Sequence, residues 1–178
     1  MKVYFVRHGK TEYNIKKMIQ GDRDIPLSDV GREEIRKFKN EVDKLEFDVC
    51  ICSPFDRAKE TAKILVGDRT NIIVNDYLKE RHVGKLEGTS TDNYDVHKYW
   101  NINYEKDELD IETPKEVLER ARRFIEYIKE NYKDETILVV AHAGIIKAIH
   151  YVIVGYDDNT DLTSFYCEHN KIYEYEIV

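Results

Sequence analysis

The sequence predicts an α/β fold, a three-layer sandwich in which helices cover both faces of a mostly parallel sheet that has one antiparallel edge element. Two patterns lead to this fold class. Four short runs of β-branched and apolar residues are typical of strands buried on both faces of a sheet, and segments with helical periodicity separate these runs. The chain has 178 residues, so residues 1–178 are expected to form a single domain.

The strands and the first two helices follow in order along the chain. The expected strands are Val3 to Val6, Val49 to Cys52, Ile72 to Val74 and Ile137 to Ala141. The first helix is expected to begin after Ser28, whose hydroxyl is a good N-cap. Its apolar stripe consists of Ile35, Phe38, Val42 and Leu45. Ser53-Pro54 is expected to open the second helix, with the proline at the first helical position.

Two further helices follow in the second half of the chain. The segment Thr113 to Glu116, with the sequence Thr-Pro-Lys-Glu, combines a capping box with a proline at the first helical position. The stripe of the helix that it starts consists of Val117, Ala121, Phe124 and Ile128. Residues 145–154 are apolar almost all round and stop at Gly155, so this helix is expected to pack deeply against the sheet.

The C-terminal residues have the pattern of a hairpin. Residues 162–168 and 171–178 flank His169-Asn170. A turn at that dipeptide would pair the two segments. We therefore expect an antiparallel element near one edge of the sheet.

Residues 89–113 interrupt the alternation of strands and helices. This segment has seven acidic residues against two lysines and shows no clean apolar period. It also contains four large aromatic residues, Tyr94, Tyr99, Trp100 and Tyr104. A loop or loosely helical insertion of this length is more often a lid than a spacer. The segment is expected to be a lid insertion within the single domain.

Charge and composition exclude several classes of partner. Lys plus Arg number 28 and Asp plus Glu 35, a formal net charge of -7, so the field of the chain repels nucleic acid and acidic membranes. No nucleic-acid partner is expected. No apolar run reaches the roughly 18 residues of a spanning helix, so no membrane partner is expected either.

The cysteines and the N-terminal residues indicate a reducing compartment. The chain has three cysteines, an odd number, and Cys50 and Cys52 would share one face of a strand, so no disulfide or metal framework is expected. The first residues are strand-like and show no apolar signal-peptide region. We expect a soluble, cytoplasmic protein.

Charged and imidazole side chains follow three of the predicted strands. In parallel α/β sheets, ligands bind beyond the carboxyl ends of the strands, so side chains at those ends are expected to meet at one rim. A chain of negative net charge that gathers two arginines and two histidines there is expected to bind an anion. The residues at these ends are Arg7, His8, Gly9, Ser53, Arg57, His142 and Gly144.

These residue types suit a phosphate group. Arginine offers a planar fork that matches phosphate oxygens, and helix N-termini expected near Thr11 and Pro54 add backbone donors. The glycines at positions 9 and 144 permit close approach of the backbone. Histidine has an ordinary pKa of about 6.5, so one imidazole can act as a nucleophile while another stabilises charge.

Four blocks of sequence stand in a recognisable order. They are Arg7-His8-Gly9-Lys10-Thr11 with Asn14, then Ser53-Pro54 with Arg57-Ala58 and Thr61-Ala62, then Leu78-Lys79-Glu80-Arg81-His82 to Gly84 with Glu87-Gly88, and finally Val140-Ala141-His142-Ala143-Gly144. Together they resemble the histidine phosphatase superfamily, also called phosphoglycerate-mutase-like. The resemblance spans most of the chain.

The resemblance implies a role for each matching residue. His8 would attack phosphorus and become a transient phosphohistidine, while Arg7, Arg57 and His142 would hold the phosphoryl oxygens. Positioned cationic donors of this kind stabilise the charge that builds on those oxygens. No metal and no cofactor are expected, because the arginines and the histidine supply the positive charge that a metal would bring.

The resemblance also implies an acid and two supporting residues. Glu80 matches the acid that protonates the leaving oxygen and then activates water. The nearby Glu87 is a second carboxylate, and either of the two could be a solvated loop residue. Asn14 and Thr11 would support the phosphate, or would only cap the helix expected to begin near Thr11.

The remaining histidines are interpreted as structural. They are His82, His97, His150 and His169. A site of two histidines and one carboxylate around His82 is conceivable, but no compact cluster with metal-ligand spacing supports it. Metal catalysis is therefore not expected.

A phosphatase that hydrolyses small phosphorylated metabolites is the preferred function, similar to the small broad-specificity or α-ribazole-phosphate phosphatases. A cofactor-dependent phosphoglycerate mutase is the main competing function. It is disfavoured because Val83 stands where an aromatic is usual and because the acidic residues 89–113 would repel a bisphosphate. A catalytically silent phospholigand-binding protein is disfavoured because His8 and Glu80 are both present, and a protein phosphohistidine phosphatase is disfavoured because a lid over residues 89–113 would hinder a protein substrate. A homodimer is left open, because exposed aromatic residues suit a dimer surface as well as a substrate lid.

Overall fold

Five strands form one sheet in the computed structural model, which describes residues 1–178. Along the sheet, the order is β3 (Ile72–Val74), β2 (Val49–Cys52), β4 (Ile137–Ala141), β1 (Lys2–Arg7) and β5 (Ile172–Glu176). Neighbouring strands are parallel except for β5, which pairs antiparallel with β1. The predicted sheet is confirmed, including its antiparallel edge.

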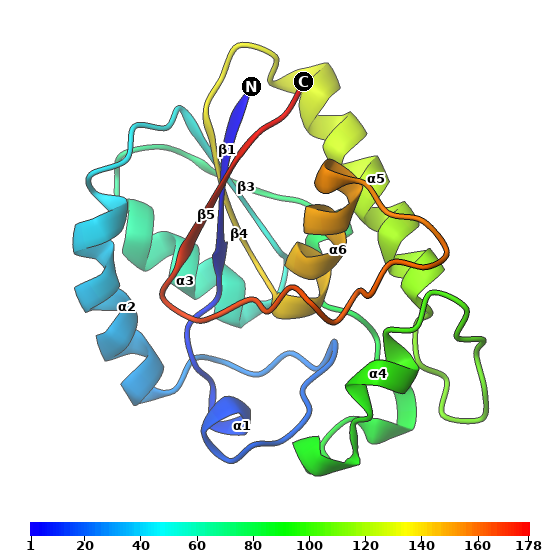
Figure 1. Ribbon diagram of the computed structural model, residues 1–178. Helices are drawn as coiled ribbons and strands as arrows, with labels where there is room; N and C mark the ends of the chain where they lie inside the picture. The colour runs from blue at the N-terminus through cyan, green and yellow to red at the C-terminus, as the bar shows by residue number, and fades with distance from the viewer.

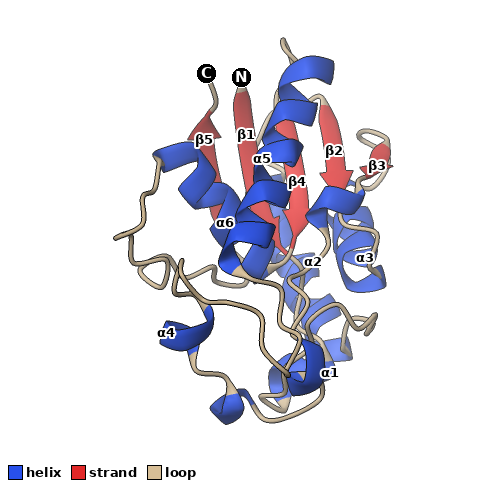
Figure 2. Cartoon of the chain, turned by 90° about the vertical axis from the view of Figure 1, so that its right-hand side faces the viewer, coloured by secondary structure: helices blue, strands red, loops and turns tan.

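Helices cover both faces of this sheet. In chain order they are α1 (Glu12–Ile15), α2 (Asp29–Val42), α3 (Asp56–Val66), α4 (Val96–Tyr99), α5 (Pro114–Asn131) and α6 (Ala143–Val154). Figure 1 shows α2 and α3 on one face and α5 and α6 on the other, which confirms the three-layer sandwich. The short helices α1 and α4 lie beyond the carboxyl ends of β1 and β4 in both Figure 1 and Figure 2.

Each face of the sheet packs on its own hydrophobic cluster. In β1, Val3 and Phe5 belong to the cluster beneath α5 and α6, whereas Tyr4 and Val6 belong to the cluster beneath α2 and α3. Alternate side chains of a strand point to opposite faces, and both faces of β1 are covered. This double burial explains why the strand sequences are apolar throughout rather than alternating.

Three predicted helix ends are confirmed. The Ser28 side chain accepts a hydrogen bond from the Gly31 backbone N–H at the start of α2. Thr113 forms the expected capping box with Glu116, and Pro114 is the first residue of α5. The last helix, α6, ends before Gly155, whose φ of 91° is open to glycine but disfavoured for other residues.

The prediction that Ser53-Pro54 opens a helix is wrong by two residues. The helix α3 begins at Asp56, and Phe55 is its N-cap without a side-chain cap bond. The Asp56 backbone N–H donates instead to Asp24 Oδ1 at 2.8 Å, from a loop distant in the sequence. Ser53 is engaged elsewhere, because its hydroxyl pairs with His142.

The predicted C-terminal hairpin is also wrong. Residues 162–168 form no strand, and β5 takes its antiparallel partner from β1 at the other end of the chain. Side-chain contacts hold the preceding segment in an irregular path: Tyr151 Oη donates to the Asp161 carbonyl at 2.8 Å and accepts from the Phe165 N–H. The antiparallel edge therefore depends on a long-range pairing that no local pattern shows.

The acidic segment 89–113 is packed against the domain at several points. It contains one 3-10 turn, Thr91–Asn93, and α4, and is otherwise irregular. Tyr99, Trp100 and Ile111 are buried, so these side chains are not free to form a dimer surface. Separately, none of the helices in the chain has the length and hydrophobicity needed to cross a membrane.

Candidate active site

The carboxyl ends of β1, β2 and β4 surround one cavity of about 280 Å³. We call the part at the strand ends the inner half; its lining residues are Arg7, His8, Arg57, Glu80, Ala143 and Gly144. The part formed by loops is called the outer half; its lining residues are Asn14, Met18, Ile19, Gln20, Gly21, Arg81, Val83, Thr91, Tyr94 and Trp100. The rim that the sequence predicts is thus a real cavity.

The two predicted catalytic histidines meet below this cavity. His8 follows the last residue of β1 and donates its backbone N–H to the Ala141 carbonyl at 2.9 Å, which ties it to the end of β4. His142 is the N-cap of α6. Their ring centroids lie 5.0 Å apart, so two segments far apart in the sequence bring their imidazoles into contact.

The surroundings of His8 leave its Nε2 unprotonated. Its Nδ1 lies 2.6 Å from the Gly9 carbonyl oxygen, and because a carbonyl only accepts, we assign the ring proton to Nδ1. This leaves a lone pair on Nε2. Burial, followed by the charges of Arg57 and Arg7, lowers the pKa of His8 well below its ordinary value. The imidazole is therefore neutral and nucleophilic at neutral pH.

His142 is fully buried behind His8 and is not part of the cavity lining. Its Nε2 lies 2.7 Å from Ser53 Oγ, and that oxygen also accepts the Phe55 backbone N–H. The Ser53 hydroxyl has no other acceptor, so we assign its hydrogen to His142 Nε2 and the ring proton to Nδ1. Nδ1 has no protein partner. Burial and the charge of Arg57 keep the pKa of His142 well below its usual range, so the ring is neutral.

The two predicted arginines, Arg7 and Arg57, each bond to backbone carbonyls through Nη atoms but leave Nε without a partner. Arg57 is fully buried and donates from Nη1 to the Arg23 carbonyl at 2.6 Å and from Nη2 to the Gly21 carbonyl at 2.8 Å. Arg7 donates from Nη1 to the Cys167 carbonyl at 3.0 Å. The Nε–H groups of both arginines are buried and unpaired.

Three residues near His8 each have one buried nitrogen without a protein partner: Arg7 Nε, Arg57 Nε and His142 Nδ1. A buried donor without a partner costs about 1–3 kcal/mol, and such groups are normally satisfied. An oxyanion placed over His8 would accept from donors of this kind. Unpaired buried donors on residues this near to His8 fit the anion site that the sequence predicts.

Glu80, from the third of the four sequence blocks, completes the lining of the inner half. Its carboxylate accepts backbone N–H groups at the start of α6, from Gly144 at 3.1 Å and from Ile145 at 3.2 Å. It also accepts the Arg81 N–H at 2.8 Å. A Cβ at position 144 would lie 2.4 Å from Glu80 Oε1, so only glycine leaves room for the carboxylate there. The second carboxylate, Glu87, lies outside the lining and pairs with Arg23 at 2.8 Å.

Asn14 and Thr11 have different positions. Asn14 lines the cavity, and its Oδ1 accepts the Thr11 backbone N–H at 3.0 Å, which leaves its amide nitrogen available. Thr11 is fully buried, caps α1 and donates its hydroxyl to Gln20 Oε1 at 2.6 Å. Thr11 thus supports Asn14 rather than lining the cavity, which matches the capping interpretation.

The outer half contains one cation, Arg81, and each of its three guanidinium nitrogens has a hydrogen-bond partner inside the protein. Arg81 donates to the Glu112 carbonyl at 2.7 Å, to Tyr94 Oη at 3.0 Å and to the Tyr99 carbonyl at 2.6 Å. Its guanidinium also lies over the Trp100 ring at 4.3 Å. The outer half therefore offers a substrate apolar and aromatic surface but no free positive charge.

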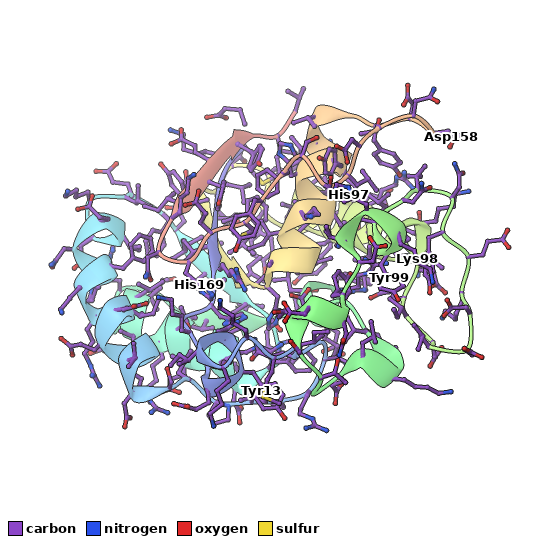
Figure 3. The ribbon with its side chains drawn as sticks, turned by 60° about the horizontal axis from the view of Figure 1, so that its bottom comes forward. Tyr13, His97, Lys98, Tyr99, Asp158 and His169 are labelled. Carbon is purple, nitrogen blue, oxygen red and sulfur yellow. The ribbon has the colours of Figure 1, made fainter.

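The other histidines lie outside the cavity lining. His82 pairs with Asp22 at 3.0 Å and with Asp110 at 3.4 Å, and so connects segment 89–113 to the loop after α1. Figure 3 labels His97 on α4 near the loop that carries Asp158. No group of three or more His, Cys, Asp or Glu side chains has an arrangement that could hold a metal ion.

The comparison with known proteins decides the family. The family model described as "Histidine phosphatase superfamily (branch 1)" matches residues 3–176. The chain belongs to this superfamily. A relative from Bacillus subtilis (strain 168), described as "Uncharacterized phosphatase PhoE", is 31% identical over 166 residues, which are 90% of this chain and 81% of the relative.

Other relatives of this histidine phosphatase carry more specific names. The "Metal-independent phosphoserine phosphatase" of Arabidopsis thaliana is 29% identical over 168 residues, 84% of this chain and 67% of the relative. Among solved structures, the α-ribazole phosphatase from Shigella flexneri matches with a TM-score of 0.85 and 23% identity, over 100% of this chain and 91% of that one. That structure supports the shared fold. The family match confirms the expected enzyme class, a phosphatase of the histidine type.

Two residues near the site are not among the predicted catalytic and phosphate-binding residues. Ser53 directly follows β2 and pairs with His142, and its place at a strand end is itself a signal. His169 is interpreted from the sequence as structural, yet its ring centroid lies 5.8 Å from that of His8. No local pattern indicates that contact, because it joins the two ends of the chain.

Proposed function

We propose that this histidine phosphatase hydrolyses small phosphomonoesters through a phosphohistidine intermediate on His8. The observation that carries the proposal is the arrangement of the inner half. His8, with an unprotonated Nε2, lines the cavity together with Arg7, Arg57 and Glu80, and Arg7, Arg57 and the neighbouring His142 each have one buried nitrogen without a protein partner. A nucleophile, donors for an oxyanion and a carboxyl group are the parts that phosphoryl transfer requires.

The first step transfers the phosphoryl group to the enzyme. His8 Nε2 forms a bond to phosphorus while the bond from phosphorus to the leaving oxygen breaks. The Glu80 carboxyl gives its proton to that oxygen, so the product leaves as an alcohol. The donors of Arg7, Arg57 and His142 meet the charge on the transferred oxygens.

The second step returns the enzyme to its starting state. The Glu80 carboxylate removes a proton from a water molecule, whose oxygen forms a bond to phosphorus as the bond to His8 Nε2 breaks. Inorganic phosphate leaves, and His8 is again neutral with its proton on Nδ1, bonded to the Gly9 carbonyl. Because Nδ1 keeps its proton in both steps, Nε2 alone exchanges partners.

We further propose that the substrate carries an uncharged, apolar or aromatic leaving group, and that residues 89–113 act as a lid over it. Met18, Val83 and Trp100 supply apolar surface in the outer half, and Tyr94 adds a ring and a hydroxyl. Each guanidinium nitrogen of Arg81 already bonds to the protein, and the guanidinium lies over the Trp100 ring. A relative from Escherichia coli (strain K12) named "Adenosylcobalamin/alpha-ribazole phosphatase" is 25% identical over 166 residues, in line with this class of substrate.

A phosphoglycerate mutase would need more positive charge than this cavity offers. Relatives with that name exist, including one from Parvibaculum lavamentivorans at 31% identity over 161 residues. A bisphosphate or a phosphoglycerate carries a second anionic group, and burying such a group without a partner is costly. The outer half has no free cation to receive it, which favours hydrolysis of a simple monoester.

The compartment is proposed from the thiols. Cys50, Cys52 and Cys167 are all free and buried. Proteins in oxidising compartments commonly pair their cysteines. We propose a cytoplasmic enzyme on this basis.

Hydrolysis of p-nitrophenyl phosphate with a chelator present tests the proposed function. The wild-type protein is expected to release phosphate under these conditions, and His8→Ala is expected to lose at least about 10³-fold in kcat. A strict need for added metal would contradict the mechanism. If the wild-type protein isomerises phosphoglycerate faster than it hydrolyses it, the protein is a mutase. If the wild-type protein binds phosphate but turns over no substrate, it is a silent binding protein.

A further inference from the structure

The turn that precedes β5 brings a third imidazole to the nucleophile. His169 is half-buried, and its ring meets that of His8 edge to face, at 5.8 Å between centroids and 76° between planes. Figure 3 labels it on the loop that leads into β5. His169 is not part of the cavity lining, and its contacts with the His8 ring and backbone give it a route to the reaction.

His169 also binds the backbone of the nucleophile. Its Nδ1 lies 2.8 Å from the His8 carbonyl oxygen, and since that oxygen only accepts, Nδ1 carries the proton. The His8 backbone N–H donates to Ala141. Strand β1 ends at Arg7, so these two bonds fix the peptide groups of the first residue beyond the strand.

The turn itself is held in place by both of its neighbours. The Cys167 carbonyl oxygen accepts a hydrogen bond from Arg7 Nη1 at 3.0 Å. Asn170 has a φ of 54° and donates from Nδ2 to Glu34 Oε2 at 3.3 Å. Lys10 Nζ lies 2.9 Å from the other oxygen of Glu34. Hydrogen bonds therefore link residues 167–170 to residues 7–10, directly and through Glu34, and fix the position of the turn beside the nucleophile.

His169 is neutral in the folded protein. Burial, followed by the charge of Arg7, lowers its pKa to about 4. It is therefore not an additional cation for the phosphoryl group. A neutral ring with Nδ1–H fixed on a carbonyl can act only by contact and by that hydrogen bond.

We propose that His169 is a positioning residue for the nucleophile. It holds the His8 carbonyl by its Nδ1–H hydrogen bond, and this bond keeps the His8 backbone, and with it Nε2, in line with phosphorus. This role rests on the proposed function. Misplacing a reacting group by about 1 Å can cost on the order of 10²-fold in rate, so an alignment of this kind has a measurable effect.

Two substitutions separate the hydrogen bond from the ring. His169→Phe keeps an aromatic ring but has no N–H, and His169→Asn keeps an N–H near the position of Nδ1. His150→Phe is the matched control, because His150 is also half-buried, bonds through Nδ1 to Tyr175 Oη at 2.7 Å and stacks on Phe165. Thermal unfolding of all three variants shows whether they fold.

In H169F, kcat for p-nitrophenyl phosphate is expected to fall roughly 10- to 100-fold with KM unchanged. H169N is expected to stay within about threefold of the wild type, and H150F is expected to match it. Vanadate, which bonds to the nucleophile as a transition-state mimic, should bind more weakly to H169F by the same factor. Sulfate, which needs only the surrounding donors, should bind equally well.

The proposal is overturned if H169F keeps the kcat and the vanadate affinity of the wild type, or if H169N is impaired as strongly as H169F. A wild-type protein that releases no phosphate refutes the proposed function instead. Crystal structures of the sulfate complexes then decide the positioning role on their own. The His8 ring should be rotated in H169F and unmoved in H169N, and an unmoved ring in both overturns the proposal.

Discussion

The inner and outer halves of the cavity satisfy their polar groups in different ways. In the inner half and directly behind it, Arg7, Arg57 and His142 each leave one buried nitrogen unpaired. In the outer half, Arg81 uses all three of its guanidinium nitrogens on Glu112, Tyr94 and Tyr99 of the protein. The inner half therefore has the unpaired donors that the proposed anion site requires, whereas every guanidinium nitrogen of Arg81 in the outer half is already bonded to the protein.

Under the proposed function, the inner half carries out the reaction and the outer half determines which substrate is preferred. The inner half stands at the ends of buried strands, where the sheet fixes backbone positions, and its donors serve any phosphoryl group. The outer half is formed by loops and by segment 89–113. It offers a ligand mainly a shaped apolar surface, which includes Met18, Val83 and Trp100. Substitutions in the inner half should therefore change the rate for every substrate, and substitutions in the outer half should change which substrate is preferred.

The largest effect is expected from Arg57→Lys. A lysine keeps the charge but has no Nε–H at that position and cannot hold the Gly21 and Arg23 carbonyls together. We expect kcat/KM to fall roughly 10²- to 10³-fold for aryl and alkyl phosphates alike. Arg69→Lys is the control, because Arg69 also binds a backbone carbonyl, that of Leu45, at 2.7 Å, but lies outside the cavity lining. Equal activity of R57K and R69K would contradict the anion site.

Gly144→Ala should have the next largest effect. The new Cβ would lie 2.4 Å from Glu80 Oε1 and should displace the carboxyl from the start of α6. Alkyl phosphates, whose leaving oxygen needs a proton, should lose about 10²-fold in kcat. The loss for p-nitrophenyl phosphate should be much smaller, because nitrophenolate leaves without a proton. Equal losses for both substrates would show that Glu80 is not the proton donor.

A pH titration of stability should show the cost of keeping His169 neutral. Its pKa is about 4 in the folded protein and about 6.5 in an unfolded chain. Between these values the unfolded state binds more protons, so stability falls as the pH drops below about 6.5. Between pH 7 and pH 5, the wild type should lose about 2 kcal/mol more than H169F in chemical denaturation. An equal loss in both proteins would contradict a neutral His169.

The smallest effect, of opposite sign, is expected at His82. Burial opposes the shift, but hydrogen bonds to Asp22 and Asp110 raise the pKa of His82 above its ordinary value. Its stabilising contribution is thus fully present below pH 6.5 and is lost as the pH rises through the folded-state pKa. The side chain is 40% exposed, so His82→Gln should cost less than about 1 kcal/mol. The cost should be measurable by thermal unfolding at pH 6 and absent at high pH.

Most of the inner half could be predicted from the sequence, because its residues stand directly after strands that local apolar patterns reveal. Four apolar runs predict the strands, and the rule that ligands bind beyond parallel strand ends places His8 and His142 together. The family resemblance adds Glu80, which no spacing could have assigned. Helix caps such as Thr113 were predictable for the same reason, since a capping box is a local pattern.

The features that were missed depend on contacts between distant segments. The start of α3 is shifted because Asp24 supplies the bond that a local N-cap would have made. The C-terminal hairpin is absent because β5 pairs with β1. The position of His169 follows from that same pairing, which carries the turn before β5 to the end of β1. None of these contacts leaves a pattern within one segment.

Chemical trapping of the intermediate tests the central claim most directly. The wild-type enzyme is mixed with an aryl phosphate, quenched within the first turnovers under alkaline conditions that preserve phosphohistidine, and digested for mass spectrometry. The peptide that contains residues 7–10 should carry one phosphoryl group on His8, and R57K should accumulate less of it. A phosphoryl group on another residue, or rapid turnover with no modified peptide at any time, would contradict the mechanism.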